Sequence, residues 1–412
     1  MEKLIVRGGQ PLCGKVCVSG SKNAALPLIF ATILTESPCT IENLPSIRDV
    51  EMSLEILRAL GARISHTDRK TVEICTRDIK ADLPPPHLVS ALRASTYLMG
   101  AMLGRFGRAY VQNFGGCNFS PRPIDMHLFA AETLGARREG DLLVAPQGLQ
   151  GATVAFDKVS VGATVNALLM AVSAKGSTVI ENAACEPHVE NLIGFLRSMG
   201  ARISRVGSSL VVEGGELGGG RISVVGDMIE GGTYLLAGLA TGGCVTVTGC
   251  ERAHLASFLS LLSGSGAEAS CESGDIEVCA SALSPLSITT GPYPEFPTDL
   301  QPQTALVAAL HGGGVVTEKI FPKRFGYLGA LGAMGLSYVR NGHTAYLFPS
   351  RLLPAEVMAS DLRGGAALLL AALSARGQSV ISGASCILRG YEDVVEKFSS
   401  IGAQIKLTEE SG

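Results

Sequence analysis

The sequence predicts a protein of the α/β (α+β) class with two large domains, built from six copies of one βαβαββ repeat. Three observations support this prediction. The chain has 412 residues, which is more than one ordinary hydrophobic core accommodates. It contains 50 glycines, and a short glycine phrase recurs along its whole length. Between the copies of this phrase, alternating apolar and polar segments follow helical segments of small apolar residues.

The recurring phrase reads LGARI in its first copy, and its central glycine returns at steps of 65 to 74 residues, as Gly61, Gly135, Gly200, Gly266, Gly335 and Gly402. Apolar residues between Val50 and Leu60 recur at helical spacing, so we expect Gly61 to end a helix in the left-handed conformation. A strand pair follows, and its second member is the alternating segment 71–75. Each phrase therefore predicts a helix that leads into a pair of strands.

The repeats open with a strand and then a helix of small residues. The strands are expected at 14–20, 151–156 and 220–226, and the helices at 23–34, 163–173 and 233–240. Each repeat exposes one apolar helix stripe, so three repeats can gather their helices inside and leave their sheets outside. Glycines flank the strand-to-helix junctions near Gly20 and at 226–232, where we expect the chain to pass from one domain to the other.

Charge and hydropathy exclude several classes of protein. With 34 basic and 37 acidic residues the net charge is −3, which argues against the basic surface that nucleic-acid binding needs. The apolar stretches 26–34 and 366–373 are far shorter than the roughly 20 residues that span a membrane. The opening MEKLIVRGG carries charges and shows no secretory signal, so we expect a cytoplasmic protein.

The cysteines predict neither a disulfide framework nor a zinc site. They number 11 and are scattered, without a Cys-x-x-Cys pair. We expect most of them to be small buried side chains in a reducing compartment.

Cys117 is the first candidate for chemistry. It follows two glycines, and Arg122 stands five residues beyond it. A cysteine near a cation has a lowered pKa and can act as an acid, a base or a nucleophile. A surface loop with an incidental cysteine is an equally weighted alternative.

Cations and one carboxylate form the remaining candidates. Lys22 and Asn23 open a helix, where backbone N–H groups favour an anion, although a solvated helix end is the alternative. Four arginines border small-residue or glycine stretches: Arg93, Arg324, Arg363 and Arg389. Each one alone is typical of a surface arginine, but together they would bind phosphate and carboxylate. Asp299 is predicted to cap a helix, or else to take a proton from a substrate hydroxyl.

The most specific motifs run from the first strand to the last: SGSKNAALP, LRAS, GGC with RPID five residues on, KVSVGAT, YPEFPTDLQ, DLRGGAALLLAA and RGYED. Together they resemble the enolpyruvyl transferase family, in its branch that acts on UDP-N-acetylglucosamine in peptidoglycan synthesis. The resemblance implies two inside-out α/β barrels of three repeats each. It also implies an N-terminal domain of residues 22–228 with a mobile Cys117 loop, a C-terminal domain of 1–21 plus 229–412, and an active site in the cleft between them.

The resemblance further implies a reaction. The enolpyruvyl group of phosphoenolpyruvate would pass to the 3-hydroxyl of UDP-N-acetylglucosamine through a tetrahedral ketal, with release of phosphate and without a metal or organic cofactor. Cys117 would protonate C3 and Asp299 would accept the hydroxyl proton, with Lys22 and Arg389 completing the catalytic set. The implied substrate-binding residues are Lys22, Asn23, Arg93, Arg122, Pro123, Ile124, Asp125, Met126, Lys158, Val159, Ser160, Val161, Asp299, Ile320, Arg324, Arg363 and Arg389. Feedback by a downstream UDP-sugar acid is also expected.

The sequence departs from the family pattern at three places and leaves two alternatives. The loop after Cys117 reads NFSP, Pro322 stands where the family is commonly acidic, and CIL precedes Arg389. Enolpyruvylshikimate phosphate synthase is the alternative enzyme, but it lacks the GGC loop and the KVSVGAT segment. A six-repeat DNA sliding clamp is the alternative outside enzymes, and it needs positively charged helices, whereas these small-residue helices carry almost no charge.

Overall fold

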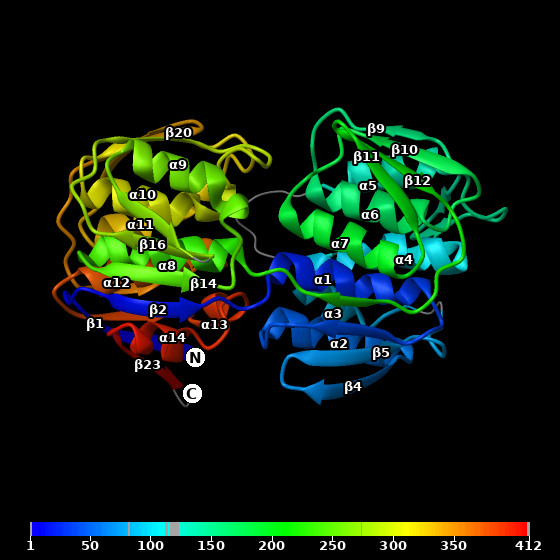
Figure 1. Cartoon of the computed structure of the whole chain (residues 1–412), viewed down its shortest axis with the longest axis horizontal. Coiled ribbons are helices and arrows are strands. Elements are labelled where there is room, and N and C mark those ends of the chain that lie inside the picture. Colours follow the sequence, from blue (N-terminus) through cyan, green and yellow to red (C-terminus); the bar gives the residue numbers. More distant parts are fainter. Residues whose placement is uncertain (1, 81–82, 112–113, 116–122, 273, 410–412) are drawn as a thin grey trace. The chain divides into compact units, whose positions relative to one another are not determined.

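The computed structural model describes residues 2–80, 83–111, 114–115, 123–272 and 274–409. The described residues form two compact units (Figure 1). We call the described residues from Gly20 to Val225 the N-unit, and the residues up to Ser19 together with those from Gly226 onward the C-unit. The chain passes from one unit to the other after Ser19 and again after Val225.

The N-unit contains alternating short strands and helices. Its helices of six residues or more are α1 (Lys22–Ala31), α2 (Arg48–Leu60), α3 (Pro86–Ala91), α4 (Tyr97–Phe106), α5 (Asp125–Thr133), α6 (Val161–Ala171) and α7 (Pro187–Ser198). Its strands are β3 (Cys39–Glu42), β4 (Arg63–Asp68), β5 (Thr71–Cys75), β6 (Arg108–Tyr110), β7 (Arg137–Glu139), β8 (Leu142–Val144), β9 (Thr153–Ala155), β10 (Ser177–Glu181), β11 (Arg202–Val206), β12 (Ser209–Glu213) and β13 (Arg221–Ser223).

The C-unit repeats this pattern. Its α-helices are α8 (Met228–Thr241), α9 (Ala256–Gly264), α10 (Gln301–Leu310), α11 (Tyr327–Ala333), α12 (Leu362–Ser374), α13 (Ser385–Leu388) and α14 (Val394–Ser400). Its strands are β1 (Glu2–Gly8), β2 (Cys13–Cys17), β14 (Cys244–Thr248), β15 (Glu268–Glu272), β16 (Asp275–Cys279), β17 (Leu286–Thr289), β18 (Gly314–Thr317), β19 (Ser337–Asn341), β20 (Thr344–Phe348), β21 (Glu356–Met358), β22 (Gly377–Ser382) and β23 (Gln404–Glu409).

Most sheets share one strand order, a parallel pair followed by an antiparallel hairpin. The sheets are β13-β3-β5-β4, β9-β10-β12-β11 and the shorter β6-β8-β7 in the N-unit, and β2-β14-β16-β15, β17-β18-β20-β19 and β21-β22-β1-β23 in the C-unit. The first strand of one sheet in each unit comes from a distant part of the sequence. Strand β2, near the N-terminus, lies parallel to β14 in the C-unit, and β13, at the end of the N-unit, lies parallel to β3. The first strand, β1, lies antiparallel between β22 and β23, so the N-terminal segment completes the last sheet (Figure 1).

The repeated glycines end helices as the sequence predicts. Each of the six has a positive φ, between 93° and 108°. At Gly61, a Cβ atom would also lie 2.9 Å from the carbonyl oxygen of Asp78, so both backbone conformation and space require glycine there. A strand or strand pair follows each of the six.

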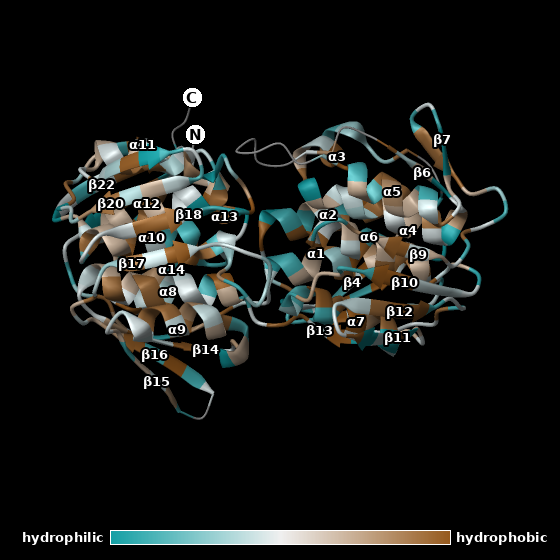
Figure 2. Ribbon diagram, turned by 90° about the horizontal axis from the view of Figure 1, so that it is seen from above, coloured by the Kyte–Doolittle hydropathy of each residue, from teal (hydrophilic) through white to brown (hydrophobic). Residues whose placement is uncertain are grey.

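Helices of small apolar residues form the interior of each unit. In α6 and α12 nearly every residue is buried, and α8, α10 and α12 pack against one another. These helices are mostly white to brown on the hydropathy scale (Figure 2). The sheets lie outside them, as the sequence predicts for an inside-out arrangement. In the part of the chain that the structure describes, no helix combines the length and the apolar character needed to cross a membrane.

The expectation for the cysteines is wrong in part. Cys244 and Cys279 form a disulfide between β14 and β16. Among the other described cysteines only Cys39 and Cys250 are buried, and Cys13, Cys17 and Cys271 are exposed. The reason is strand periodicity: neighbouring valines occupy the inward positions of these strands, which leaves several cysteines on outward positions.

Candidate active site

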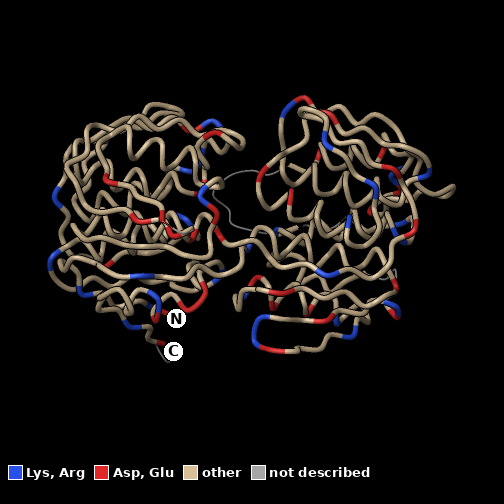
Figure 3. Tube along the Cα trace, in the orientation of Figure 1, with Lys and Arg blue, Asp and Glu red and all other residues tan. Residues whose placement is uncertain are grey.

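The candidate residues gather at the N-terminal ends of the interior helices. In the N-unit, Lys22 begins α1, Arg93 begins the short helix η2 (Arg93–Thr96) before α4, and Ser160 caps α6. In the C-unit, Asp299 lies in η4 (Thr298–Leu300) before α10, and Arg363 lies in the first turn of α12. Helix α6 contains no acidic or basic residue, and α12 contains only Arg363. Figure 3 shows that most of the chain is neither acidic nor basic. Because helix N-termini carry partial positive charge, this arrangement favours an anionic ligand.

Asp299 is shared by two buried arginines. Arg324, in η5 (Arg324–Gly326), donates Nη1 to Oδ1 of Asp299 at 2.7 Å. Arg363 donates Nε and Nη2 to Oδ2 at 3.1 and 2.9 Å. The arginine side chains are each 5% exposed and that of Asp299 is 23% exposed. Burial alone would raise the pKa of Asp299, but the charges of Arg363 and Arg324 outweigh it and hold that pKa well below its usual range.

This cluster excludes one of the two alternatives that the sequence leaves open for Asp299 and for each of the two arginines. Asp299 does not cap a helix: Pro297 and Leu300 occupy the N-cap positions of η4 and α10, and its carboxylate points to the arginines instead. Arg324 and Arg363 are not surface arginines, because the shared carboxylate offsets the cost of burying their charge. Arg93 and Arg389 are half-buried.

Glu318 supports this cluster through a hydrogen bond from Thr298, which also contacts Arg324. It is 1% exposed and follows strand β18. Its Oε1 accepts the Thr290 hydroxyl at 2.8 Å and the backbone N–H groups of Ile320 and Phe321 at 2.8 and 2.9 Å. Its Oε2 accepts the Thr298 hydroxyl at 2.9 Å, and the Thr298 oxygen in turn accepts a hydrogen bond from Arg324 at 2.9 Å. Glu318 therefore positions the half-buried Ile320, and it positions Arg324 through Thr298.

Lys22 is paired inside the N-unit. Its Nζ lies 2.7 Å from Oδ2 of Asp49, and the two side chains are 14% and 3% exposed. Asp49 lies in the first turn of α2, where a carboxylate is favoured by the helix dipole. Lys22 is therefore not part of a freely solvated helix end, and Asn23 beside it is half-buried.

A hydrogen-bonded chain links α4, α5 and α6. Oδ1 of Asn166 accepts the backbone N–H of Gly100 at 2.7 Å, so its Nδ2 donates to Nδ1 of His127 at 2.8 Å. His127 therefore carries its proton on Nε2. Burial, together with the positive charge of Arg93, lowers the pKa of His127 to about 4, and it is neutral at pH 7. These contacts hold together the helices that carry the remaining candidates of the N-unit.

Those remaining candidates lie on two segments at helix starts. Pro123, Asp125, Lys158 and Val159 are exposed, whereas Ile124, Met126, Ser160 and Val161 are half-buried. The Ser160 hydroxyl accepts the backbone N–H of Ala163 at 3.4 Å, which caps α6. Both segments therefore offer polar groups to solvent from fixed helix ends.

Arg389 follows α13 and precedes a buried polar group. The hydroxyls of Tyr391 and Thr233 lie 2.9 Å apart. The guanidinium carbon of Arg363 lies 5.8 Å from the centroid of the Tyr391 ring. The segment after α13 thus packs against the Asp299 cluster through Tyr391.

Two predicted residues lie outside the described residues, Cys117 and Arg122. Their roles stay predictions. The structure brings Asp299, Arg324 and Arg363 together in the C-unit, and it places Lys22 against Asp49 in the N-unit.

Sequence reasoning missed the residues that support the candidates: Asp49, His127, Asn166 and Glu318. One of them had a visible signal, because Asn166 is a polar residue inside the otherwise apolar helix segment TVNALLMA. The others stand in segments whose polarity is typical of a surface, and only the tertiary fold shows that they are buried.

Comparison with known proteins decides the family. The family model described as EPSP synthase (3-phosphoshikimate 1-carboxyvinyltransferase) matches residues 6–398. The chain belongs to this family, the enolpyruvyl transferases. A curated relative from Bacillus cereus, UDP-N-acetylglucosamine 1-carboxyvinyltransferase 2, is 42% identical over 413 residues and covers 98% of this chain and 96% of its own. A relative of the same name from Streptococcus mutans is 41% identical and covers 100% of both chains.

Solved structures of this enolpyruvyl transferase family have the same fold. The enolpyruvyl transferase NikO from Streptomyces tendae superimposes with a TM-score of 0.89 at 27% identity, covering 100% of this chain and 99% of that one. EPSP synthase from Acinetobacter baumannii superimposes with a TM-score of 0.74 at 18% identity, covering 99% and 100%, which shows the fold alone. The fold class predicted from the sequence is confirmed.

Proposed function

We propose that this enolpyruvyl transferase transfers the enolpyruvyl group of phosphoenolpyruvate to the 3-hydroxyl of UDP-N-acetylglucosamine, the first committed step of peptidoglycan synthesis. The observation that supports it most is the cluster of Asp299 with Arg324 and Arg363, which joins a carboxylate base to two anion-binding guanidinium groups. Curated relatives that are 41–42% identical and cover 98–100% of this chain carry the name of this activity.

The reaction needs an acid and a base on either side of the reacting carbon. The sugar hydroxyl oxygen bonds to C2 of phosphoenolpyruvate, its proton passes to Asp299, and C3 receives a proton from Cys117. The tetrahedral ketal then loses the phosphate at C2 and a proton at C3, which restores the enol double bond. Arg363, Arg389 and Lys22 stabilise the negative charge on the phosphate and carboxylate of the substrate.

The arginines determine when Asp299 can act as a base. With its pKa held well below the usual range, the carboxylate is a weak base while both guanidinium groups bind it. An anionic substrate competes for the same guanidinium groups, and each hydrogen bond that moves to the substrate raises the pKa of Asp299. Substrate binding therefore activates the base.

Further parts of the proposal rest on the family resemblance. The active site in a cleft between the domains, the sugar-nucleotide contacts of 122–126 and 158–161, a cytoplasmic location and feedback by a downstream UDP-sugar acid all stay predictions. Adding such an acid at rising concentration to the phosphate-release assay tests the last of them, and an unchanged rate would contradict it.

Variants of the cluster test the proposed roles. Phosphate release from phosphoenolpyruvate is measured with UDP-N-acetylglucosamine for the wild type, Arg363→Lys and Arg351→Ala, where Arg351 is an exposed arginine of the same unit. Lysine keeps the charge but lacks the planar guanidinium that donates both Nε–H and Nη2–H to Oδ2 of Asp299, so we expect turnover to fall by about tenfold or more. The Arg351 variant should retain wild-type turnover. Equal turnover in all three proteins would contradict the proposal.

A further inference from the structure

The outward face of the sheet β15-β16-β14-β2 carries a cysteine row that the proposed reaction does not use. In the strand register Cys244 lies opposite Cys279 on β16 and opposite Cys13 on β2. Residues directly opposite one another lie on the same face of a sheet. The alternate positions Val245 and Val278 are buried, so the cysteine row faces away from the core.

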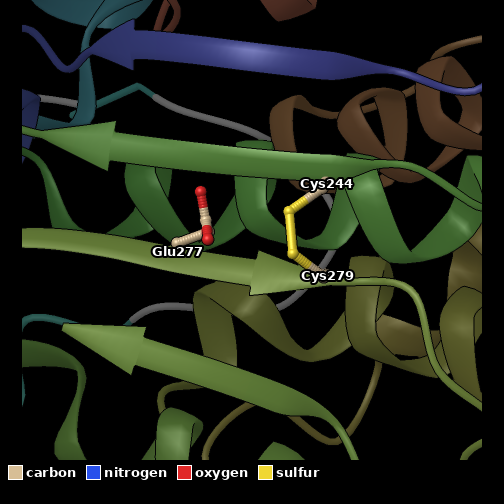
Figure 4. Close-up of side chains that lie close together, drawn as sticks. All are labelled: Cys244, Glu277 and Cys279. Carbon is tan, nitrogen blue, oxygen red and sulfur yellow. A yellow bond between two sulfur atoms is a disulfide. The ribbon is translucent and has the colours of Figure 1, made fainter.

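Backbone hydrogen bonding brings Cys244 and Cys279 unusually close. The N–H of Cys244 points away from β16 and donates to the carbonyl oxygen of Leu12 at 3.0 Å. The N–H of Ala280 donates to the carbonyl oxygen of Gly243 at 2.8 Å. Cys244 and Cys279 are therefore a non-hydrogen-bonded pair, the kind in which opposing Cα atoms approach most closely. Their Cα atoms lie 4.0 Å apart, and their sulfur atoms are bonded (Figure 4).

Glu277 adds a third group to this pair. It stands two residues before Cys279 on the same strand and so shares its face. Ligand atoms of Cys244, Glu277 and Cys279 all lie within 4.8 Å of one another. The hydroxyl of Thr246 donates to Oε2 of Glu277 at 2.7 Å, which orients the carboxylate as an outer hydrogen bond orients a metal ligand.

The charges nearby permit a cation at this place. Lys15, opposite Thr246 on β2, donates to Oδ2 of Asp275 at 2.6 Å. Its ammonium group is thus matched by a carboxylate other than Glu277. Glu268, opposite Cys279 on β15, adds a further negative charge to the same row.

We propose that this face is a binding site for a zinc-class divalent cation, formed when the Cys244–Cys279 disulfide is reduced. Thiolates and carboxylates both bind Zn²⁺, thiolates favour Zn²⁺ and Cd²⁺ over harder cations, and water would occupy the fourth position. A dithiol reductant supplies two electrons and two protons and itself becomes a disulfide. A phosphine supplies two electrons and takes the oxygen of a water molecule to become a phosphine oxide, and the two protons of that water go to the sulfur atoms. Either reductant converts the disulfide into two thiols. The cation then displaces the two thiol protons. The disulfide and the metal exclude each other, because sulfur atoms bonded to one another cannot act as thiolates.

The test measures metal binding in the two redox states of the full chain. A Cys13→Ser background removes the neighbouring thiol of the row. Co²⁺ and Zn²⁺ are titrated into oxidised protein, and into protein reduced by a phosphine that is then removed without oxygen. Cobalt reports thiolate ligation through its charge-transfer absorption, and a chromophoric chelator competes for Zn²⁺. We expect one additional equivalent of metal in the reduced protein and none at this site in the oxidised protein.

Three further variants assign the ligands. Cys279→Ser should abolish the additional equivalent, and Glu277→Gln should weaken it on the order of 10- to 100-fold. Cys271→Ser is the matched control, since Cys271 is exposed on the same sheet but lies opposite the buried Ile276, on the other face. Its binding should be unchanged. Circular dichroism checks that each variant is folded.

Either of two results would overturn the proposal. One is reduced protein that binds no more metal than Cys279→Ser, which would leave the disulfide a structural cross-link only. The other is a Glu277→Gln variant that binds as tightly as its parent. Phosphate release is not a readout in this test, so the outcome is independent of the proposed enzymatic function.

Discussion

Asp299→Asn is the substitution that probes the arginine cluster most sharply. Asparagine keeps one oxygen for Arg324 but turns an N–H group toward Nε and Nη2 of Arg363, which are donors themselves. Removing one partner of a buried ion pair costs about 3–5 kcal/mol, and the partial exposure of Asp299 lowers this to about 2–4 kcal/mol. Turnover should fall by about 10²- to 10⁴-fold, the usual contribution of a general base.

Two measurements separate the structural effect from the chemical effect. Urea unfolding is followed by circular dichroism, since the chain has 0 tryptophans. In a double-mutant cycle, adding Arg363→Met to Asp299→Asn removes the buried charge that the first change left uncompensated. The double variant should therefore be more stable than the sum of the single effects, by a coupling energy of about 1–3 kcal/mol. Additive stability losses, or wild-type turnover in Asp299→Asn, would refute this reasoning.

The pH dependence of stability follows from the lowered pKa of Asp299. Its stabilising contribution is complete above the pKa of about 3.9 that the unfolded chain has, and it is lost as pH falls further toward the folded-state pKa. In Asp299→Asn the part of the stability loss at low pH that comes from protonating Asp299 should be missing. A variant that loses stability between pH 4 and pH 2 as steeply as the wild type would contradict the assignment.

Three other predictions concern Glu318, His127 and Cys117. Glu318→Gln should destabilise the protein by about 1–3 kcal/mol, because neutral hydrogen bonds replace four charged ones, and urea unfolding checks this; an unchanged midpoint would contradict the supporting role of Glu318. His127→Asn keeps an acceptor for Asn166 but cannot titrate. The wild type should lose about 3 kcal/mol of unfolding free energy as pH falls from about 6.5 to 4, and the variant should not. Urea unfolding at several pH values measures this, and an equal dependence of unfolding free energy on pH in both proteins would exclude His127 as its cause. Cys117→Asp should keep some activity and resist alkylation by fosfomycin, an epoxide that resembles phosphoenolpyruvate; peptide mapping that finds the label on another cysteine would remove Cys117 from the mechanism.

The repeat architecture could be predicted because its signals are local. A glycine that ends a helix is recognisable from the apolar spacing before it and the strand pattern after it, as at Gly61. Small apolar residues along a whole helix likewise predict an interior position. The exchange of β2 and β13 depends on pairing between strands about 230 and 180 residues apart, which no local pattern encodes.

The site could be predicted in its residue types but not in its contacts. Arg324, Arg363 and Asp299 were candidates from their sequence context, yet their burial depends on partners 25 and 64 residues away. Glu318 resembles an ordinary strand-end acid until its four donors are known. The cysteine row shows the same limit: alternation predicts which residues face outward, but only the register places Cys244 opposite Cys279.

Acceptor choice is the most direct test of the proposed function. The purified chain is given phosphoenolpyruvate with UDP-N-acetylglucosamine, with shikimate 3-phosphate, or with no acceptor, and both phosphate release and the mass of the acceptor are followed in a single turnover. We expect phosphate release only with UDP-N-acetylglucosamine, together with a product whose mass has increased by one enolpyruvyl group. Equal or faster turnover with shikimate 3-phosphate, or phosphate release without an enolpyruvyl product, would contradict the proposed function.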